Sequence, residues 1–287
     1  MVKLLAEHAF AKINLFLRIT GRRENGYHEL DSIFVPVSIS DRVAMELRPA
    51  ETSRVALRCN IATLADAESN LASRAARDFM REFRICAAVA IDLQKTIPAG
   101  AGLGGGSSDA GTVLRMMASI THITDLERLR EVALGLGADV PFFLNPRPSR
   151  VTGIGERIVA LERFPRLHLV LAVPPIEVPT ASVFKALKRE GWSGPARWDD
   201  LEEIMRGNMR PRDLVNDLEA PATQLFPQIS HLKALLQESG ATAALMTGSG
   251  GAVFGLFPDA STSERAAAEL RMRMPKAHVF AAQSFPA

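Results

Sequence analysis

The sequence of 287 residues predicts an α+β fold with two lobes and a cleft between them. In the first 60 residues, apolar and polar residues alternate in several short segments, which is typical of strands that follow one another without helices. Further along, capping residues precede segments with helical periodicity. The proline-rich stretch NPRPSR at 145–150 marks a boundary, so we expect domains at 1–150 and 151–287.

The N-terminal part is expected to form a sheet and one helix. Ser69 or Asn70 caps a helix that runs to about residue 83, and the stretch AAVAIDLQKTI at 87–97 returns as a strand. Because the earlier strands follow one another directly, an antiparallel sheet is favoured. Those earlier strands are expected at 9–19, 33–37, 42–47 and 55–58.

After residue 97 helices and strands are mixed. A helix is expected at about 107–119, and Thr124 with Glu127 forms a capping box for another that ends near residue 136. Strands are expected near 167–173, 243–246, 252–257 and 277–282. Helices are expected near 181–189, 221–238 and 261–274.

Composition and charge argue against several classes of protein. The formal net charge is +2 and the basic residues are scattered, so we expect no nucleic-acid partner. No apolar stretch is long enough for a membrane span, and the first residues lack a signal peptide's pattern, so we expect a cytoplasmic protein without a membrane partner. Cys59 and Cys86 lack the spacing of a metal site. No feature specifies an oligomeric state.

The stretch PAGAGLGGGSSDAGT at 98–112 has six glycines and leads from an expected strand into an expected helix. Unpaired N–H groups at a helix start bind anions, so this loop is a candidate phosphate site. It lacks the G-K-[ST] ending of a Walker loop. Ser107 and Ser108 are either N-caps or phosphate ligands.

Three other interpretations of this loop are weaker. A dinucleotide-binding loop would follow the first strand of a parallel unit, and the acidic Asp125 about twenty positions on is already explained by its place in a helix's first turn. A protein-kinase loop would lead into a strand. A purely structural turn does not need so many glycines, because each one costs chain entropy on ordering.

The glycine stretch resembles the second signature of the GHMP kinases, the superfamily of galactokinase, homoserine kinase, mevalonate kinase and phosphomevalonate kinase. Within it, the chain is similar to the family that phosphorylates a cytidylyl alcohol of the non-mevalonate isoprenoid pathway. Further matching motifs are AFAKINLFLRITGRRENGYHEL at 9–30, ESNL at 68–71, LGADVPFFL at 136–144, GIGE at 153–156, VPTASVFKAL at 178–187 and TGSGGAVFGLF at 247–257. Ala101 interrupts the glycine run, and Asp109 replaces the Asn that relatives often have.

The resemblance implies a two-lobed GHMP kinase fold with a deep cleft, an N-terminal ATP-binding domain at 1–150 and a C-terminal domain at 151–287. It implies transfer of phosphate from ATP, with magnesium, to the 2-hydroxyl of 4-(cytidine 5′-diphospho)-2-C-methyl-D-erythritol. The magnesium ligands stay unknown. Alternatives are a GHMP kinase for another alcohol such as homoserine or mevalonate, a nucleotide-binding regulator without catalysis, and a dinucleotide-dependent oxidoreductase.

The resemblance also assigns roles to individual residues. Lys12, otherwise a solvated strand lysine, and Asp139, otherwise a helix-capping acid, become the catalytic pair at the reacting hydroxyl. Asn14, two residues from Lys12 on the same strand face, is a candidate for hydrogen bonding to the acceptor.

Two further groups of residues are assigned to substrate and nucleotide. Tyr27 and Phe184 are expected to sandwich the cytosine ring while His28 hydrogen-bonds its edge and Thr180 supports this region. The stretch Thr247, Gly248, Ser249 and Gly250 is expected to close over acceptor and phosphates, or to be a plain hairpin turn. The expected ATP site comprises Asn70, Leu71, Lys95, Pro98, Ala99, Gly100, Ala101, Gly102, Leu103, Gly104, Gly105, Gly106, Ser107 and Ser108.

Overall fold

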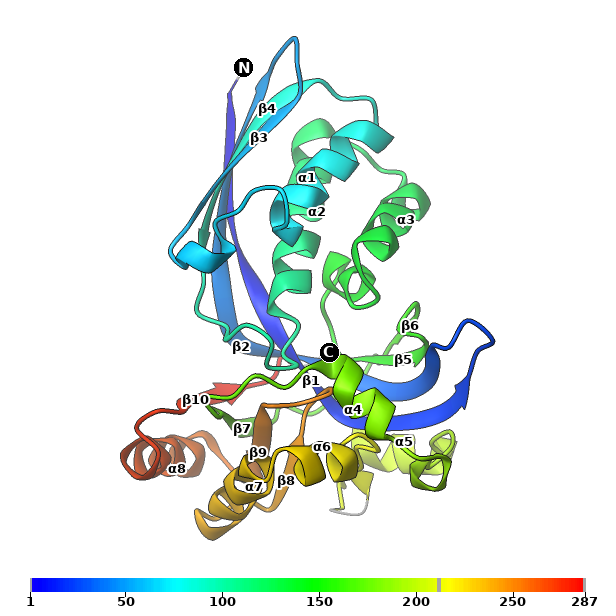
Figure 1. The fold of residues 1–287 in the computed structure, drawn as a ribbon, viewed down its shortest axis with the longest axis vertical. Helices are drawn as coiled ribbons and strands as arrows, with labels where there is room; N and C mark the ends of the chain where they lie inside the picture. Colours follow the sequence, from blue (N-terminus) through cyan, green and yellow to red (C-terminus); the bar gives the residue numbers. More distant parts are fainter. Residues whose placement is uncertain (1, 211–212, 286–287) are drawn as a thin grey trace. The chain divides into compact units, whose positions relative to one another are not determined.

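The computed structural model of this chain describes residues 2–210 and 213–285, which form two compact units that each combine separate stretches of sequence (Figure 1). The first unit contains the described residues up to Ala11 together with Ile39–Ile97 and Gly104–Pro146. The second contains Lys12–Ser38, Pro98–Leu103 and the described residues from Arg147 onward. Both units mix strands and helices, which confirms the predicted α+β class. The domain division at residue 150 stays a prediction.

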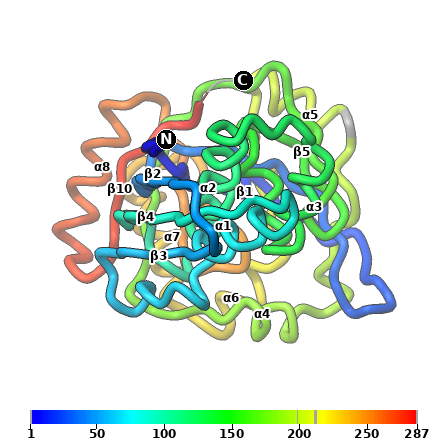
Figure 2. The backbone as a smooth tube through the Cα atoms, turned by 90° about the horizontal axis from the view of Figure 1, so that it is seen from above, coloured from blue at the N-terminus to red at the C-terminus, as the bar shows by residue number. Residues whose placement is uncertain are grey.

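In the first unit, helices cover one face of a sheet (Figure 1). Strand β4 (Ala87–Gln94) lies between β2 (His28–Pro49), which is antiparallel to it, and β3 (Arg54–Cys59), which is parallel to it (Figure 2). β1 (Lys3–Arg22) pairs with β2, and both strands continue into the second unit. The other elements are η1 (Ala62–Leu64), α1 (Leu71–Glu82), α2 (Gly105–Thr121), α3 (Leu126–Leu136) and η2 (Val140–Leu144).

The core of the first unit follows from strand periodicity. Val43, Met45 and Leu47 on β2 are buried, and their sequence neighbours are more exposed. These side chains pack with apolar residues of β4, α1, α2 and α3 in one cluster. Burying one such side chain stabilises the fold by about 1.5–3 kcal/mol.

The second unit is built around an antiparallel sheet in the order β10, β7, β9, β8. Its strands are β7 (His168–Val173), β8 (Ala243–Met246), β9 (Val253–Phe257) and β10 (His278–Gln283). Their buried residues pack against helices, mainly α7 and α8, in a second apolar cluster. The remaining elements are β5 (Ser149–Gly153), β6 (Arg157–Ala160), α4 (Thr180–Ala186), η3 (Arg189–Gly191), α5 (Trp198–Met205), α6 (Glu219–Leu225), α7 (Gln228–Glu238) and α8 (Ala260–Arg273).

Several predicted elements differ in the structure. The segments predicted at 33–37 and 42–47 are one strand, β2, because Ile39 and Asp41 continue its inward-facing alternation. The expected antiparallel sheet is wrong for β3 and β4, which are parallel because α1 provides a crossover between them. The helix expected at 221–238 is divided into α6 and α7 at Phe226 and Pro227. Strands β5 and β6 and helix α5 were not predicted.

Two predicted helix starts are also corrected, and one is confirmed. The side chain of Asp125, not of Thr124, caps α3 by accepting a hydrogen bond from the Arg128 N–H at 3.1 Å. Gly104, not a serine, is the N-cap of α2. Asn70 caps α1 as predicted. In the described part of the chain, no helix combines the length and apolar character that crossing a bilayer requires.

Candidate active site

Strand β1 brings Lys12 and Asn14 to the same face of the second unit. The Lys12 ammonium donates a hydrogen bond to Asn14 Oδ1 at 2.6 Å and lies 4.6 Å from the centre of the Phe34 ring. Lys12 is only 3% exposed, so the interpretation as a solvated surface lysine is wrong. A charge buried to this extent requires specific partners, which makes this strand face a candidate for function.

The Asn14 side chain is held in one orientation. Its Nδ2 donates to Ser32 Oγ at 2.9 Å, and the Ser32 hydroxyl in turn donates to the Phe16 carbonyl at 2.5 Å. Because an ammonium is only a donor, these bonds direct Asn14 Oδ1 toward Lys12. The Asn14 N–H also donates to Thr247 Oγ1 at 2.8 Å, so the lysine face is tied to the 247–250 stretch.

The first half of the glycine loop packs on the same residues. Lys12 N–H donates to the Leu103 carbonyl at 3.0 Å, and Ala252 N–H donates to the Ala101 carbonyl at 3.1 Å. A Cβ added to Gly102 would lie 2.6 Å from the Thr247 carbonyl oxygen. A glycine is therefore needed at position 102, where the backbone of the glycine loop approaches the backbone of the 247–250 stretch closely.

The interruption of the glycine run at Ala101 has a geometric explanation. Positive φ angles occur at the alternate positions Gly100, Gly102 and Gly104, with values of 69°, 78° and 70°. Ala101 falls between them, where the backbone does not require glycine. The alanine is thus compatible with the loop's conformation.

The stretch 247–250 connects β8 to β9, as the hairpin interpretation expects, and it is also anchored from other elements. Asn216 Nδ2 donates to the carbonyls of Met246 and Gly248, both at 2.8 Å. The hydroxyls of Thr180 and Ser249 lie 2.7 Å apart. Thr180 begins α4, so this contact links the predicted substrate helix to the predicted phosphate-closing stretch.

In the first unit, the second half of the glycine loop starts α2. Gly104 adopts the left-handed conformation as N-cap, and Ser107 and Ser108 lie inside the helix. The Ser108 hydroxyl donates to the Phe10 carbonyl at 2.7 Å. Helix α2 thus begins at Gly105, two residues earlier than predicted from the sequence. The unpaired N–H groups of its first turn belong to Gly105–Ser107, and such groups can bind an anion.

The other residues predicted for ATP have structural roles in this unit. Asn70 Oδ1 accepts from the Ala72 N–H at 2.9 Å, and its Nδ2 donates to the Leu64 carbonyl at 2.9 Å. Leu71 lies 3.4 Å from the position of an added Cβ on Gly106. The Lys95 ammonium is buried between the carboxylates of Asp41 and Asp109.

Asp139 stands immediately before η2 and is half-buried. It occupies the N-cap position, but its side chain makes no capping hydrogen bond to the backbone of η2. The capping interpretation of this acid is therefore wrong. Its carboxylate is not used to start the helical turn, and its catalytic role stays a prediction.

The residues predicted to bind cytosine lie at the start of β2 and on α4. The rings of His28 and Phe184 are stacked, with centroids 5.1 Å apart, and Trp192 packs edge-on against His28 at 5.7 Å. Tyr27, in the preceding turn, is 64% exposed. Burial and the nearby Arg22 charge lower the pKa of His28, so its imidazole is neutral at pH 7.

Four residues of these networks were not predicted from the sequence. Ser32 and Asn216 orient Asn14 and the 247–250 stretch, Trp192 contacts His28, and Asp41 contacts Lys95. Asp41 had a detectable signal, because it falls on the inward face of an otherwise apolar alternation in β2. The other three carry no comparable local pattern.

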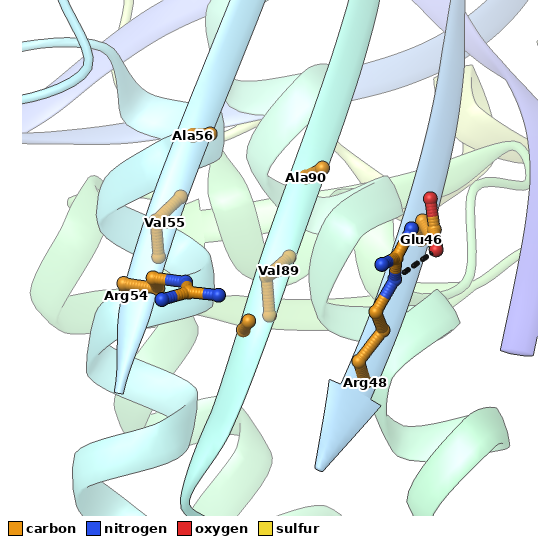
Figure 3. A pocket seen from close by; sticks show the side chains of 8 residues that line it. Glu46, Arg48, Arg54, Val55, Ala56, Val89 and Ala90 are labelled. Carbon is orange, nitrogen blue, oxygen red and sulfur yellow. Dashed lines mark hydrogen bonds and ion pairs between the residues drawn. The ribbon is translucent and has the colours of Figure 1, made fainter. Parts of the chain in front are cut away.

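A shallow pocket lies elsewhere in the first unit, on strands β2, β4 and β3 (Figure 3). Glu46 and Arg48 form an ion pair at its rim, and small or branched apolar side chains of β4 and β3 line its floor. None of the predicted site residues is among its lining residues, which are Glu46, Arg48, Arg54, Val55, Ala56, Ala88, Val89 and Ala90. This pocket is therefore separate from the candidate active site.

Comparison with known proteins identifies the family of this chain. The GHMP kinases N terminal domain matches residues 70–146, and the GHMP kinases C terminal model matches residues 183–276. A 4-diphosphocytidyl-2-C-methyl-D-erythritol kinase of Anaeromyxobacter dehalogenans strain 2CP-1 is 40% identical over 269 residues, covering 92% of this chain and 84% of that protein.

Solved structures give the same family. A crystal structure of 4-(cytidine 5′-diphospho)-2C-methyl-D-erythritol kinase has a TM-score of 0.83 and 36% identity, covering 98% of this chain and 99% of its own. The homoserine kinase from Cytophaga hutchinsonii has a TM-score of 0.74 at 16% identity, covering 99% and 95%, and so shares the fold. The GHMP kinase fold predicted from the sequence is thereby confirmed, and the chain belongs to the 4-diphosphocytidyl-2-C-methyl-D-erythritol kinase family of the GHMP kinases.

Proposed function

We propose that this protein transfers the γ-phosphoryl group of ATP to the 2-hydroxyl of 4-(cytidine 5′-diphospho)-2-C-methyl-D-erythritol, in the non-mevalonate route to isoprenoid precursors. Family membership supports an ATP-dependent kinase. The structural observation that carries the proposal is the contact of three predicted motifs in the second unit. Lys12 and Asn14, the loop residues 101–103, and the 247–250 stretch are joined by direct hydrogen bonds.

The acceptor hydroxyl is activated by Asp139 and Lys12 in this proposal. Asp139 orients the 2-hydroxyl and accepts its proton as the new O–P bond forms, while the bond between the γ-phosphorus and the β,γ-bridging oxygen of ATP breaks and ADP leaves. Lys12 offsets the negative charge on the transferred phosphoryl group, and Asn14 fixes the ammonium by accepting one of its hydrogen bonds. A buried ammonium that is held by a hydrogen bond suits this electrostatic role.

The nucleotide is bound as MgATP. The glycine loop and the first turn of α2 offer backbone N–H groups to its phosphates, and glycine leaves room for close approach. In the described parts of the chain, no three His, Cys, Asp or Glu side chains gather into a metal site. Magnesium that arrives with ATP keeps phosphate and water ligands and needs few from the protein.

The cytidylyl end of the acceptor is bound by the aromatic residues of β2 and α4. Phe184 offers a flat face to the base, and the neutral His28 imidazole supplies one donor and one acceptor for its edge. Tyr27 is exposed and available as a second stacking surface. One face of Phe184 stacks on His28, so the base is expected to stack on the other face of the Phe184 ring.

Product analysis tests the proposal. The protein is incubated with MgATP and the cytidylyl alcohol, and the product is examined by phosphorus and carbon NMR. A new monophosphate coupled to the quaternary carbon that bears the 2-hydroxyl is expected. Phosphorylation at another hydroxyl, or formation of ADP without any phosphorylated alcohol, would refute the assignment.

A further inference from the structure

Three charged side chains form a buried cluster below the start of α2. The Lys95 ammonium donates to Asp109 Oδ2 at 2.6 Å and also contacts Asp41 Oδ2. The exposed fractions of the three side chains are 3% for Lys95, 4% for Asp109 and 0% for Asp41. Water is thus excluded from all three charges, and the ammonium has a carboxylate on two sides.

The cluster joins the end of β4 to the first turns of α2. Asp41 Oδ1 accepts from the N–H groups of Thr96 at 2.5 Å and Ile97 at 2.8 Å. A Cβ added to Gly105 would lie 3.3 Å from Lys95 Nζ and 3.0 Å from Ile97 Cγ2. The ammonium therefore lies directly against the first residue of α2, where the proposed phosphate-binding N–H groups begin.

The charges of the cluster do not balance when all three groups are ionised. Burial raises the pKa of Asp109 to about 8; the Lys95 charge opposes this shift and the Asp41 charge adds to it. Burial acts to lower the pKa of Lys95, but Asp109 and Asp41 outweigh it and raise that pKa. Asp109 Oδ1 has no hydrogen-bond partner, which fits a carboxyl that holds a proton at pH 7.

No other charged group contributes to this balance in the described surroundings of Asp109. Helices α1 and α3 and the turn η2 pack against α2 through apolar residues of one cluster. On β1, Glu7 pairs with Arg115 further along α2. Lys95 and Asp41 are the charged groups that act on the Asp109 carboxyl.

We propose that Lys95 is a positioning residue, held by Asp41 and Asp109, that sets the first turn of α2 for ATP and does not itself contact the nucleotide. This inference rests on the proposed function, and it revises the expectation from sequence that Lys95 is an ATP ligand. Both faces of the ammonium are already bonded to carboxylates, so its charge is neutralised inside the protein. Its effect on phosphate binding passes through Gly105 and the α2 backbone.

A second substitution that restores ATP binding to a Lys95 variant would show that Lys95 positions the site and does not contact ATP. Lys95→Met leaves the buried Asp41 carboxylate without its counter-ion and Asp109 without its hydrogen-bond donor, and the Kd for ATP, measured calorimetrically, is expected to rise about 2- to 30-fold. Lys95→Met combined with Asp41→Asn removes both charges of the ion pair, and the asparagine oxygen can still accept from the N–H groups of Thr96 and Ile97. This double variant is expected to bind ATP within about twofold of wild type, since it leaves no buried charge without a partner.

Direct contact predicts the opposite result. If Lys95 bound ATP itself, the double variant would bind as weakly as Lys95→Met or worse, and the proposal would be overturned. The double variant decides the question even if Lys95→Met does not fold. Lys276→Met, at an exposed lysine, is the control for loss of one positive charge.

The pH dependence of the Kd for ATP is a second test, because a purely structural role of Lys95 would not change it. As the pH rises through about 8, Asp109 loses its proton and the cluster gains a net negative charge behind the phosphate site, so the wild-type Kd for ATP should increase. Asp109→Asn should remove this dependence, and a persisting dependence would contradict the proposal. Absence of ATP binding by wild type would refute the proposed function instead, so the two failures are distinguishable.

Discussion

The ammonium of Lys12 is bonded to the side-chain oxygen of Asn14 at 2.6 Å, and both residues are almost fully buried on one face of β1. Ser32 on the neighbouring strand and Thr247 of the β8–β9 connection fix the asparagine from two other directions. The lysine charge is therefore directed by a network drawn from three separate parts of the sequence. If Lys12 acts on the transferred phosphoryl group, this network determines the position of the ammonium relative to that group.

Asn14→Leu should lower kcat by about 10- to 150-fold, because a hydrogen bond to a charged group contributes about 1.5–3 kcal/mol. KM for ATP should change much less, since the glycine loop is untouched. Steady-state kinetics and a melting curve measure both effects. Asn208→Leu, at an exposed asparagine, is the control and should leave kcat unchanged. A normal kcat for Asn14→Leu would remove this network from the reaction.

Asp139→Asn should reduce kcat by about 10²- to 10⁴-fold while the melting temperature stays close to that of wild type. The melting temperature is expected to hold because asparagine has nearly the same size and shape as aspartate. Asp125→Asn, at the residue whose side chain caps α3, removes the same charge and should leave kcat unaffected. Combination of Asp139→Asn with Lys12→Ala should cost far less than the product of the single losses, since both act on one step.

Gly104→Val should abolish ATP binding. Gly104 has a φ of 70°, which a β-branched residue adopts only with strain, and it is the N-cap from which the α2 amides extend. ATP should therefore fail to raise the melting temperature of this variant, whereas it protects wild type by mass action. Gly135→Val in α3 is the control, since an added Cβ there meets nothing within 4 Å. Equal protection of Gly104→Val and wild type would contradict a phosphate-binding loop.

Phe184→Ala should raise KM for the cytidylyl substrate by about 5- to 150-fold, because stacking of a base on an aromatic ring contributes about 1–3 kcal/mol. The base is remote from the reacting hydroxyl, so kcat should change less and KM for ATP should stay constant. Initial-rate measurements with each substrate varied in turn separate these effects. A rise confined to KM for ATP would place Phe184 at the nucleotide instead.

Local signals were sufficient for most of the fold. Short β patterns predicted β3 and β4, strands were also predicted close to β7, β8, β9 and β10, and Asn70 was a correct helix cap. The errors have local physical causes. A glycine with positive φ began α2 earlier than the serines suggested, and Asp125 competed successfully with Thr124 for the α3 cap. The parallel pairing of β3 with β4 depends on a crossover, which strand patterns alone do not reveal.

The candidate site was predictable only in part. Sequence motifs predicted site roles for the loop, Lys12 and the 247–250 stretch, but the residues that orient them in the structure come from distant segments. Asn216 is 32 positions from Gly248, and Ser32 is 18 positions from Asn14. Lys95 was predicted as an ATP ligand from the family resemblance. Its burial between Asp41 and Asp109 became visible only when β2 and α2 were placed around it.

The substrate assignment is tested most directly by comparing kcat/KM for several alcohols at saturating MgATP. The set comprises 4-(cytidine 5′-diphospho)-2-C-methyl-D-erythritol, methylerythritol 4-phosphate, homoserine and mevalonate, with ADP release as the common readout. Our account predicts efficient turnover of the cytidylyl alcohol and very poor turnover of the other three, because only that alcohol carries a base for the Phe184 and His28 region. Equal or faster turnover of homoserine, mevalonate or the truncated methylerythritol phosphate would contradict it.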